Sequence, residues 1–183
     1  MNKKIDLLRR KLDRLREGGV PRCWDLFGGC GGLSLGFHTA AFEISAAVEL
    51  DPEAARTHAH NFHRSENPGV VEVHSKARDI CQLEPADLLA ELGITSDPAE
   101  VVDVLLGGPP CQAYARVGRA KLREVGEHAT AFLNDPRGQL FERYLHYVDV
   151  LKPPVVVMEN VPDVMNYSHI NYDCSQRCCA RTV

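Results

Sequence analysis

A cysteine in a stiff turn is the most reactive side chain that the sequence offers. Cys111 stands in Gly107-Gly-Pro-Pro-Cys-Gln112, directly after the apolar run 101–106, which is typical of a buried strand. A thiol in such a turn can act as a nucleophile if positive charge nearby lowers its pKa, and four basic residues follow between positions 116 and 123. A lone cysteine is more often a small buried hydrophobe. The glycines and prolines around this one favour a chemical role.

Glycines and acids elsewhere indicate a nucleoside-bearing ligand. The segment Asp25-Leu-Phe-Gly-Gly-Cys-Gly-Gly-Leu-Ser-Leu-Gly36 follows one apolar run and leads into a helical pattern. Its glycines allow a tight turn and a close approach to a ligand at the carboxyl end of a first strand. Glu49 ends the next apolar run, where an acid can accept hydrogen bonds from a ribose. Asp79 could reach an adenine amino group from the same edge, or could simply cap a loop.

A further carboxylate ends the last apolar run, in Met158-Glu-Asn-Val161. If parallel strands carry these residues, Glu159 shares one edge of the sheet with Cys111 and Glu49. Dry surroundings there would favour the protonated carboxyl, which can act as a general acid. The alternative is a structural glutamate that pairs with a loop.

These residues need a scaffold in which strands and helices alternate, and the sequence has that rhythm. Nearly continuous apolar runs indicate strands that are covered on both faces, so the predicted fold class is α/β, doubly wound. Strands are predicted at 22–27, 44–48, 70–73, 101–106 and 154–158. Helices are predicted after the glycine-rich turn, from about Pro52, at 85–92 and at 136–151.

The same patterns divide the chain into three segments. Residues 1–19 form a basic amphipathic helix that packs either on its own domain or on a partner. Its apolar residues stand at helical spacing, namely Ile5, Leu8, Leu12 and Leu15. The main segment is 20–167, within which 108–135 is a long connection that is functional or mobile. Residues 168–183 are predicted to be an irregular tail.

Composition excludes several classes of protein. With 183 residues, 44% of them hydrophobic, the chain fits one globular domain with a core, and its net charge of −4 gives no global positive field. The sequence has no apolar run of about 18 residues and no signal peptide, so we expect no membrane contact and a cytoplasmic location. The seven cysteines are an odd, scattered set, which favours reduced thiols. No metal site is predicted, because Cys174, Cys178 and Cys179 lack a second ligand pair.

Together and in this order, the motifs resemble the catalytic half of the DNA (cytosine-5) methyltransferases, which use S-adenosylmethionine. The resemblance rests on Asp-Leu-Phe-x-Gly-x-Gly-Gly from Asp25, on Gly-Gly-Pro-Pro-Cys-Gln, on Glu-Asn-Val and on Asn134-Asp-Pro-Arg-Gly-Gln-Leu-Phe141. It covers roughly residues 23–167. It implies a Rossmann-like S-adenosylmethionine-dependent methyltransferase fold that is incomplete at its C-terminal side.

For catalysis, the resemblance implies that the Cys111 thiolate adds to carbon 6 of cytosine, which makes carbon 5 nucleophilic. Glu159 would hydrogen-bond and protonate the ring nitrogen, and Asn160 would order the active-site loop. The target base must leave the duplex stack, and the loop after Cys111 would close over it and meet phosphate. The residues implied in nucleic-acid contact are Gln112, Arg116, Arg119 and Lys121.

For S-adenosylmethionine, the resemblance implies a pocket at the carboxyl ends of the strands. Phe27 would contact the adenine or sulfonium end, Glu49 the ribose hydroxyls and Leu50 the adenine. The other implied contacts are Cys30, Gly31 and Gly32 along the methionine part, Asp79 and Ile80 at the adenine edge, and Pro110 and Leu140 in the wall.

The sequence also departs from the family pattern. Ala115 stands where the family usually has serine. Nothing after Tyr167 matches the family's target-recognition domain or its closing helix, so we expect a truncated chain whose end, 168–183, is unrelated sequence from a shifted frame, an early stop or an artificial junction.

Two alternatives to an active DNA methyltransferase stay open. One is the related branch of the family that methylates tRNA. The other is a catalytically silent module, completed by a second polypeptide for which the helix 1–19 is a candidate contact. In the full-length protein we expect double-stranded DNA as the partner and a bacterial-type cytoplasm, with nucleoid association during action. A restriction-modification, phage or regulatory role is equally compatible with the sequence.

Overall fold

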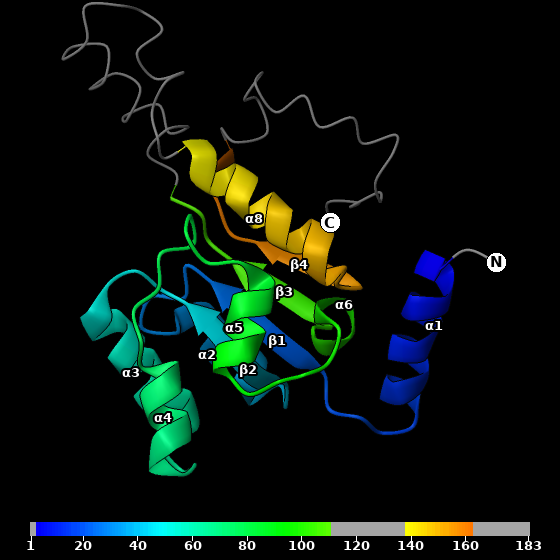
Figure 1. Ribbon diagram of the computed structural model, residues 1–183, viewed down its shortest axis with the longest axis horizontal. Coiled ribbons are helices and arrows are strands. Elements are labelled where there is room, and N and C mark those ends of the chain that lie inside the picture. Colours follow the sequence, from blue (N-terminus) through cyan, green and yellow to red (C-terminus); the bar gives the residue numbers. More distant parts are fainter. Residues whose placement is uncertain (1–2, 111–137, 163–183) are drawn as a thin grey trace, which may run out of the picture.

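Four strands and seven helices make up residues 3–110 and 138–162, the part of the chain that the structure, a computed structural model, describes. In chain order they are α1 (Lys3–Arg16), β1 (Arg22–Leu26), α2 (Gly32–Thr39), β2 (Glu43–Val48), α3 (Pro52–His63), α4 (Pro68–His74), α5 (Pro85–Glu91), α6 (Pro98–Val101), β3 (Val104–Gly107), α8 (Gly138–Leu151) and β4 (Val155–Met158). The strands form one sheet in the order β2-β1-β3-β4 (Figure 1), and every neighbouring pair is parallel.

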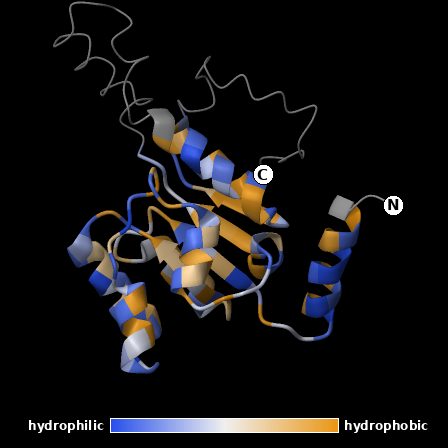
Figure 2. Ribbon diagram, viewed as in Figure 1, coloured by the Kyte–Doolittle hydropathy of each residue, from blue (hydrophilic) through white to orange (hydrophobic). Residues whose placement is uncertain are grey.

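Helices cover both faces of the sheet, and each face has its own core. The core beneath α5 and α8 includes Trp24, Leu88, Leu105, Tyr144 and Leu151. The core beneath α2 and α3 includes Cys23, Ile44, Val104 and Leu106, with Phe37 and Phe62 packed against it. Figure 2 shows the central strands as hydrophobic ribbons, as expected for strands with no solvent face. The prediction of a doubly wound α/β fold is confirmed.

Side-chain caps and prolines set where several helices begin. Asp51 accepts hydrogen bonds from the backbone N–H groups of Glu53 and Ala54, at 2.9 and 2.8 Å, and Pro52 occupies the first turn of α3. Asn67 caps α4 in the same way, at 3.0 Å from the N–H of Val70. Each such cap typically stabilises a helix by about 1 kcal/mol.

The strand predicted at 70–73 is wrong, because these valines lie inside α4. A short apolar run does not distinguish a strand from one buried turn of helix. The pair Asn67-Pro68, a capping residue followed by a proline in the first turn, is the local signal that decides for a helix. Asp79 therefore follows a helix and a connecting segment rather than a strand.

The strand predicted at 101–106 begins later than expected. Val101 ends the short helix α6, which the sequence reading missed, and β3 starts at Val104. The strands predicted at 22–27, 44–48 and 154–158 are confirmed, as are the helices predicted from Pro52 and at 85–92. The helix predicted at 136–151 is confirmed from residue 138, where the described part of the chain resumes. Of the helices described here, none is long and apolar enough to cross a membrane.

Candidate functional site

The glycine-rich turn after β1 is folded against the end of β2. The N–H groups of Phe27 and Gly28 both donate to the carbonyl of Val48, at 2.9 and 3.3 Å. Phe27 has a φ of 61°, and Gly29 and Gly31 have φ values of 53° and 95°. A left-handed conformation costs a residue with a side chain roughly 1 kcal/mol. Phe27, predicted to contact the cofactor, is thus held in a strained backbone position at this turn.

The turn lies directly on α3, which explains one of its glycines. A Cβ added at Gly31 would stand 2.3 Å from the Phe62 ring and 3.1 Å from the His58 ring, so any larger residue collides with α3. A Cβ at Gly32 or Gly29 would have nothing within 4 Å. The open side of the turn is where a ligand can approach the backbone.

Glu49 joins the turn to the start of α3. Its Oε2 accepts a hydrogen bond from the N–H of Gly29 at 2.8 Å, and its Oε1 accepts one from the N–H of Asp51 at 2.8 Å. Each carboxylate oxygen can accept a second bond. The side chain therefore fixes the turn and keeps free acceptor positions for a hydroxyl group. Leu50, the next residue, is 67% exposed beside it.

The segment that carries Asp79 and Ile80 lies beside Glu49, although no strand leads into it. The N–H of Arg78 donates to the Glu49 carbonyl at 2.7 Å, which brings the segment to the same edge of the sheet. The Asp79 carboxylate accepts bonds from the Cys81 N–H at 2.9 Å and from the Gln82 side chain at 3.2 Å. These bonds fit the alternative interpretation of Asp79 as a loop cap. Its contact with an adenine stays a prediction.

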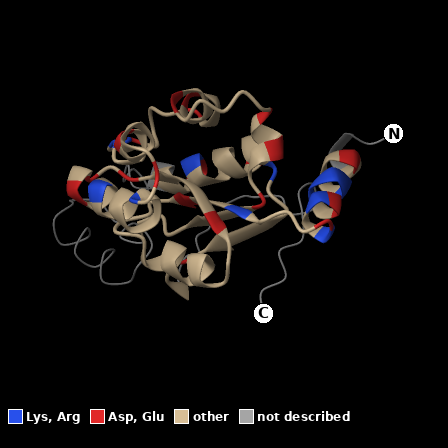
Figure 3. Ribbon diagram, turned by 90° about the horizontal axis from the view of Figure 1, so that it is seen from below, with Lys and Arg blue, Asp and Glu red and all other residues tan. Residues whose placement is uncertain are grey.

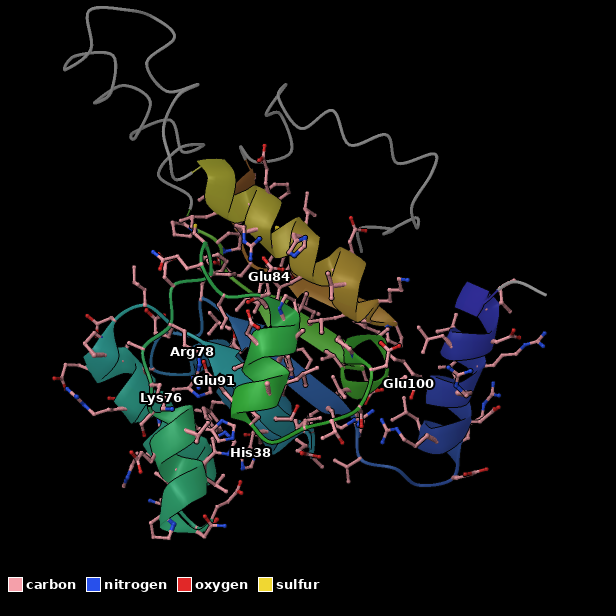
Figure 4. The ribbon with its side chains drawn as sticks, in the orientation of Figure 1. His38, Lys76, Arg78, Glu84, Glu91 and Glu100 are labelled. Carbon is pink, nitrogen blue, oxygen red and sulfur yellow. The ribbon has the colours of Figure 1, made fainter. Side chains whose placement is uncertain are left out.

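Helix α8 holds this segment in place. Arg143 donates to the carbonyls of Ile80 and Leu83, at 2.9 and 2.7 Å, and pairs with Glu84 at 2.9 Å. Figure 4 shows Glu84 between α5 and α8. Leu140, in the first turn of α8, packs against the core cluster that contains Ile80. Because Ile80 is only 4% exposed, its side chain belongs mainly to the core.

The ends of β3 and β4 form the second half of the site. The N–H of Glu159 donates to the Gly107 carbonyl at 3.0 Å. A Cβ at Gly107 would stand 2.6 Å from the buried Tyr144 ring and 2.7 Å from the carbonyl of Leu26, so only glycine fits there. The Asn160 side chain donates to the Pro109 carbonyl at 2.9 Å and accepts from the Val161 N–H at 2.9 Å. Asn160 thus ties the two strand ends together.

Glu159 follows β4 and Glu49 follows β2. Because the strands are parallel, both residues lie at the carboxyl ends of the strands. Its Oε2 would lie 3.3 Å from a Cβ added at Gly108, so the carboxyl stands against the turn that leads to Cys111. Its side chain is exposed, which does not match the dry surroundings expected from the sequence. Pro110 is partly buried at the end of the same turn. The other predicted contacts, Cys111, Gln112, Arg116, Arg119 and Lys121, lie outside the described residues.

A buried polar network below the glycine turn was not predicted. The Ser34 hydroxyl donates to Asp25 Oδ2 at 2.6 Å and lies 3.2 Å from His58 Nε2. With the Ser34 hydroxyl proton directed at an ionised Asp25, the neutral His58 tautomer that completes the network carries its proton on Nε2 and donates to Ser34. All three side chains are at most 2% exposed. The sequence signal for the network was an aspartate inside an apolar strand.

Burial sets the protonation of this network. It raises the pKa of Asp25, and the hydrogen bond from Ser34 opposes that shift. It lowers the pKa of His58 from 6.5 to about 4, and His63 adds to the shift. His58 is therefore neutral at pH 7 and supports the turn as a hydrogen-bond donor.

A cavity lies away from these residues. It has a volume of about 740 Å³ and is lined by residues near the amino end of β2 and on α4, among them Phe42, Ile44, His63, Val70 and His74. It contains none of the predicted site residues. Within residues 3–110 and 138–162, no cluster of three or more His, Cys, Asp or Glu side chains is arranged to hold a metal ion.

The parallel sheet, with its glycine turn after β1 and its acid after β2, has the Rossmann-like fold of the methyltransferases. Residues 21–176 match the profile of the C-5 cytosine-specific DNA methylases. The chain belongs to this family. The match runs past Tyr167 into the segment expected to be unrelated sequence, which the structure does not describe.

Relatives and a solved structure agree with the family. A protein of Oceanobacillus iheyensis, proposed to be the type II methyltransferase M.OihORF3336P, is 40% identical over 152 residues, which are 83% of this chain and 31% of that protein. The type II methyltransferase M1.HphI of Haemophilus parahaemolyticus is 33% identical, over 79% of this chain and 33% of its own length. A solved structure of a protein encoded within an E. coli prophage, proposed to be a DNA modification methyltransferase, gives a TM-score of 0.58 at 31% identity, over 81% of this chain and 35% of that one. The chain thus spans about a third of the length of these proteins.

Proposed function

We propose that this chain contributes the cofactor-binding and catalytic part of an enzyme that methylates carbon 5 of cytosine in double-stranded DNA. The observation that carries the proposal is the placement of Glu49 and Glu159 at the carboxyl ends of strands in one parallel sheet. Glu49 stands beside the glycine turn, and Glu159 stands against the turn that leads to Cys111. A nucleoside cofactor and a reacting base can therefore meet between them.

The residues around the glycine turn fit S-adenosylmethionine, which supplies an electrophilic methyl group when bound. The open backbone at Gly29 and Gly32 leaves space for the methionine part, and Cys30 and Gly31 follow the same curve. Glu49 has free acceptor positions for the ribose hydroxyls. Leu50 offers an exposed apolar surface beside it for the adenine.

The proposed reaction begins at Cys111. Its thiolate forms a bond to carbon 6 of cytosine, and the electrons of the 5,6 double bond move through the ring to nitrogen 3, which takes a proton from Glu159. Carbon 5 then forms a bond to the methyl group as the bond between that group and its donor sulfur breaks, and nitrogen 3 returns its proton to Glu159. A base removes the hydrogen of carbon 5, the bond to sulfur breaks, and the cysteine leaves as a thiolate. The net change replaces one hydrogen of cytosine by methyl.

Asn160 supports this arrangement as a positioning residue. Its side chain holds the Pro109 carbonyl at 2.9 Å, two residues before Cys111. The same residue follows Glu159 directly, so one hydrogen bond links the segment of the proposed acid to the turn that precedes the proposed nucleophile. An enzyme gains much of its rate from such fixed geometry.

The proposal places target recognition outside this chain. Because the chain spans about a third of these relatives, we propose that a longer form of the protein or a second polypeptide supplies the DNA-reading surface. The basic residues Arg116, Arg119 and Lys121 would meet phosphate near the flipped base. Action on DNA would place the enzyme at the nucleoid of a bacterial-type cytoplasm.

The test uses the chain at high concentration and duplex DNA in which every cytosine carries fluorine at carbon 5, so that no target sequence has to be read. Because fluorine cannot be removed as a cation, the last step fails and the cysteine adduct persists. We expect mass spectrometry to find the adduct on Cys111 in the presence of S-adenosylmethionine. The Cys111→Ser variant should form no adduct, yet should bind the cofactor in calorimetry as the wild-type chain does.

The alternatives predict different results. Methyl transfer to tRNA but not to DNA would assign the chain to the tRNA branch of the family. Cofactor binding without an adduct or methyl transfer on any cytosine substrate would identify a silent module. Either result would overturn the proposal.

A further inference from the structure

The apolar stripe of α1, formed by Ile5, Leu8 and Leu12, faces away from the domain on which α1 packs. These side chains are 49%, 43% and 36% exposed. The sequence left open whether the helix packs on its own domain or on a partner. The structure shows that α1 packs on its own domain through a different side and leaves this stripe exposed.

Mainly polar side chains attach α1 to the domain. Nζ of the buried Lys11 donates to the carbonyls of Val102, Leu151 and Lys152, at 2.6, 3.4 and 3.2 Å. Arg14 forms an ion pair with the buried Asp103. These contacts anchor the helix without using its stripe.

Two further contacts complete this side of the helix. Arg10 pairs with Glu100 at 2.6 Å, and Figure 4 shows Glu100 on the side of α6 that faces α1. Leu7 is the buried apolar contact, at 9% exposed. The orientation of α1 is thus fixed from one side, and the stripe is presented to solvent.

The stripe has the spacing of a coiled-coil seam. Ile5, Leu8 and Leu12 occupy positions a, d and a of successive heptads. Arg9 and Arg16 then fall at position e, which borders the seam, and both are exposed. Figure 3 shows how strongly Lys and Arg gather on α1. A partner helix would meet apolar residues at the centre and positive charge at the border.

This charge pattern indicates which kind of helix would bind the stripe. In an antiparallel pair of two copies, position e faces position e, so Arg9 and Arg16 would oppose arginines. In a parallel pair, position e faces position g, and Lys11 at that position is buried against the domain of its own chain. Neither arrangement of two copies places an acidic side chain opposite the arginines, whereas a helix with glutamates at its border positions would neutralise them.

We propose that α1 is a docking helix for a separate polypeptide that presents an amphipathic helix with a leucine or isoleucine seam and acidic border positions. The docking site lies before residue 21, where the match to the methylase family begins. It is therefore a property of this chain that the catalytic proposal does not require. Binding would bring a second chain to the side of the domain formed by α6 and the end of α8.

The test measures binding of the full chain to a synthetic helix of four heptads, with isoleucine and leucine at a and d and glutamate at e and g. Repulsion between glutamates keeps this peptide largely unfolded alone, so helix formation on mixing is visible by circular dichroism. Fluorescence anisotropy of the labelled peptide gives the affinity. A second peptide with lysine at e and g is the matched probe, and we expect it to bind at least about tenfold more weakly.

Variants of the chain separate the seam from the charge. Leu8→Ser with Leu12→Ser should weaken binding of the acidic peptide by roughly tenfold or more. Arg9→Glu with Arg16→Glu should reverse the preference, so that the lysine peptide binds better. The matched controls are Leu35→Ser, an exposed leucine on α2, and Arg64→Glu at the end of α3, neither of which should change either affinity.

Three results would overturn the proposal. The first is equal affinity for the two peptides, or binding that survives the loss of both leucines. The second is dimerisation of the chain alone, seen in sedimentation and abolished by the leucine substitutions, because the stripe would then bind a second copy. The third is a loss of DNA binding in the arginine variant alone, because α1 would then contact nucleic acid.

Discussion

His58 should make the protein sensitive to mild acid. Burial lowers its pKa to about 4, from an ordinary 6.5. As the pH falls below about 6.5, the unfolded chain binds a proton at this residue while the folded chain does not, so stability is lost progressively until about pH 4. Between pH 7 and pH 5, these two pKa values give a loss of roughly 2 kcal/mol in the free energy of unfolding.

The substitution His58→Gln isolates this contribution. Glutamine keeps a side-chain donor for Ser34 but does not titrate. Urea denaturation, followed by the fluorescence of the single and buried Trp24, gives the free energy of unfolding at pH 7, 6 and 5. We expect the wild-type protein to lose roughly 2 kcal/mol more than the His58→Gln variant over this range. Changing the exposed His60 on the same helix to glutamine should leave the wild-type slope unchanged.

Parallel slopes for the wild-type protein and His58→Gln would refute the assignment of His58 as a neutral donor below the glycine turn. A nuclear magnetic resonance titration of the wild-type protein gives an independent measurement. The ring of His58 should stay neutral, with the proton on Nε2, down to about pH 5. A ring that titrates near pH 6.5 would contradict the same reasoning, even if the variant fails to fold.

Three other perturbations test the scaffold. Gly31→Ala places a methyl group 2.3 Å from an aromatic ring at a φ of 95°, so urea denaturation should show a loss of roughly 2 kcal/mol or more, whereas Gly36→Ala, with free space, should be stabilising or neutral. Burial lowers the pKa of Lys11 from 10.5 to about 8, so the wild-type protein should gain stability relative to the Lys11→Met variant as the pH increases from 8 toward 10.5. Asn160→Ala should reduce the yield of the Cys111 adduct with fluorinated DNA while cofactor affinity in calorimetry stays unchanged; an equal loss of both would mean that Asn160 supports the whole fold.

Most of the sheet could be predicted from sequence because its central strands, β1 and β3, are buried on both faces. Continuous apolar runs then indicate strands, and the glycines and acids that end them indicate which edge carries the site. The exception at 70–73 shows the limit of that signal. Three valines among four consecutive residues fit a strand and a helical turn equally well. The capping residue Asn67 before them is the signal that indicates a helix.

The polar contacts could not be predicted in the same way. Periodicity showed that α1 is amphipathic, but it is the charged side of the helix that contacts the domain. Lys11 on that side donates hydrogen bonds to three carbonyls of the domain. The network of Ser34 and His58 below Asp25 depends on how α2 and α3 cross the sheet. No local pattern reports such a crossing. Glu159 shows the converse, since its position was predictable while its exposure was not.

The carboxylate of Glu49 has a consequence for the internal motions of the protein. One side chain holds the amide of Gly29 in the turn and the amide of Asp51 at the start of α3. When this side chain rotates away, both amides lose their acceptor in the same event. Hydrogen exchange at the two positions should therefore follow one common opening, and any ligand hydroxyl that binds Glu49 should slow both amides by the same factor.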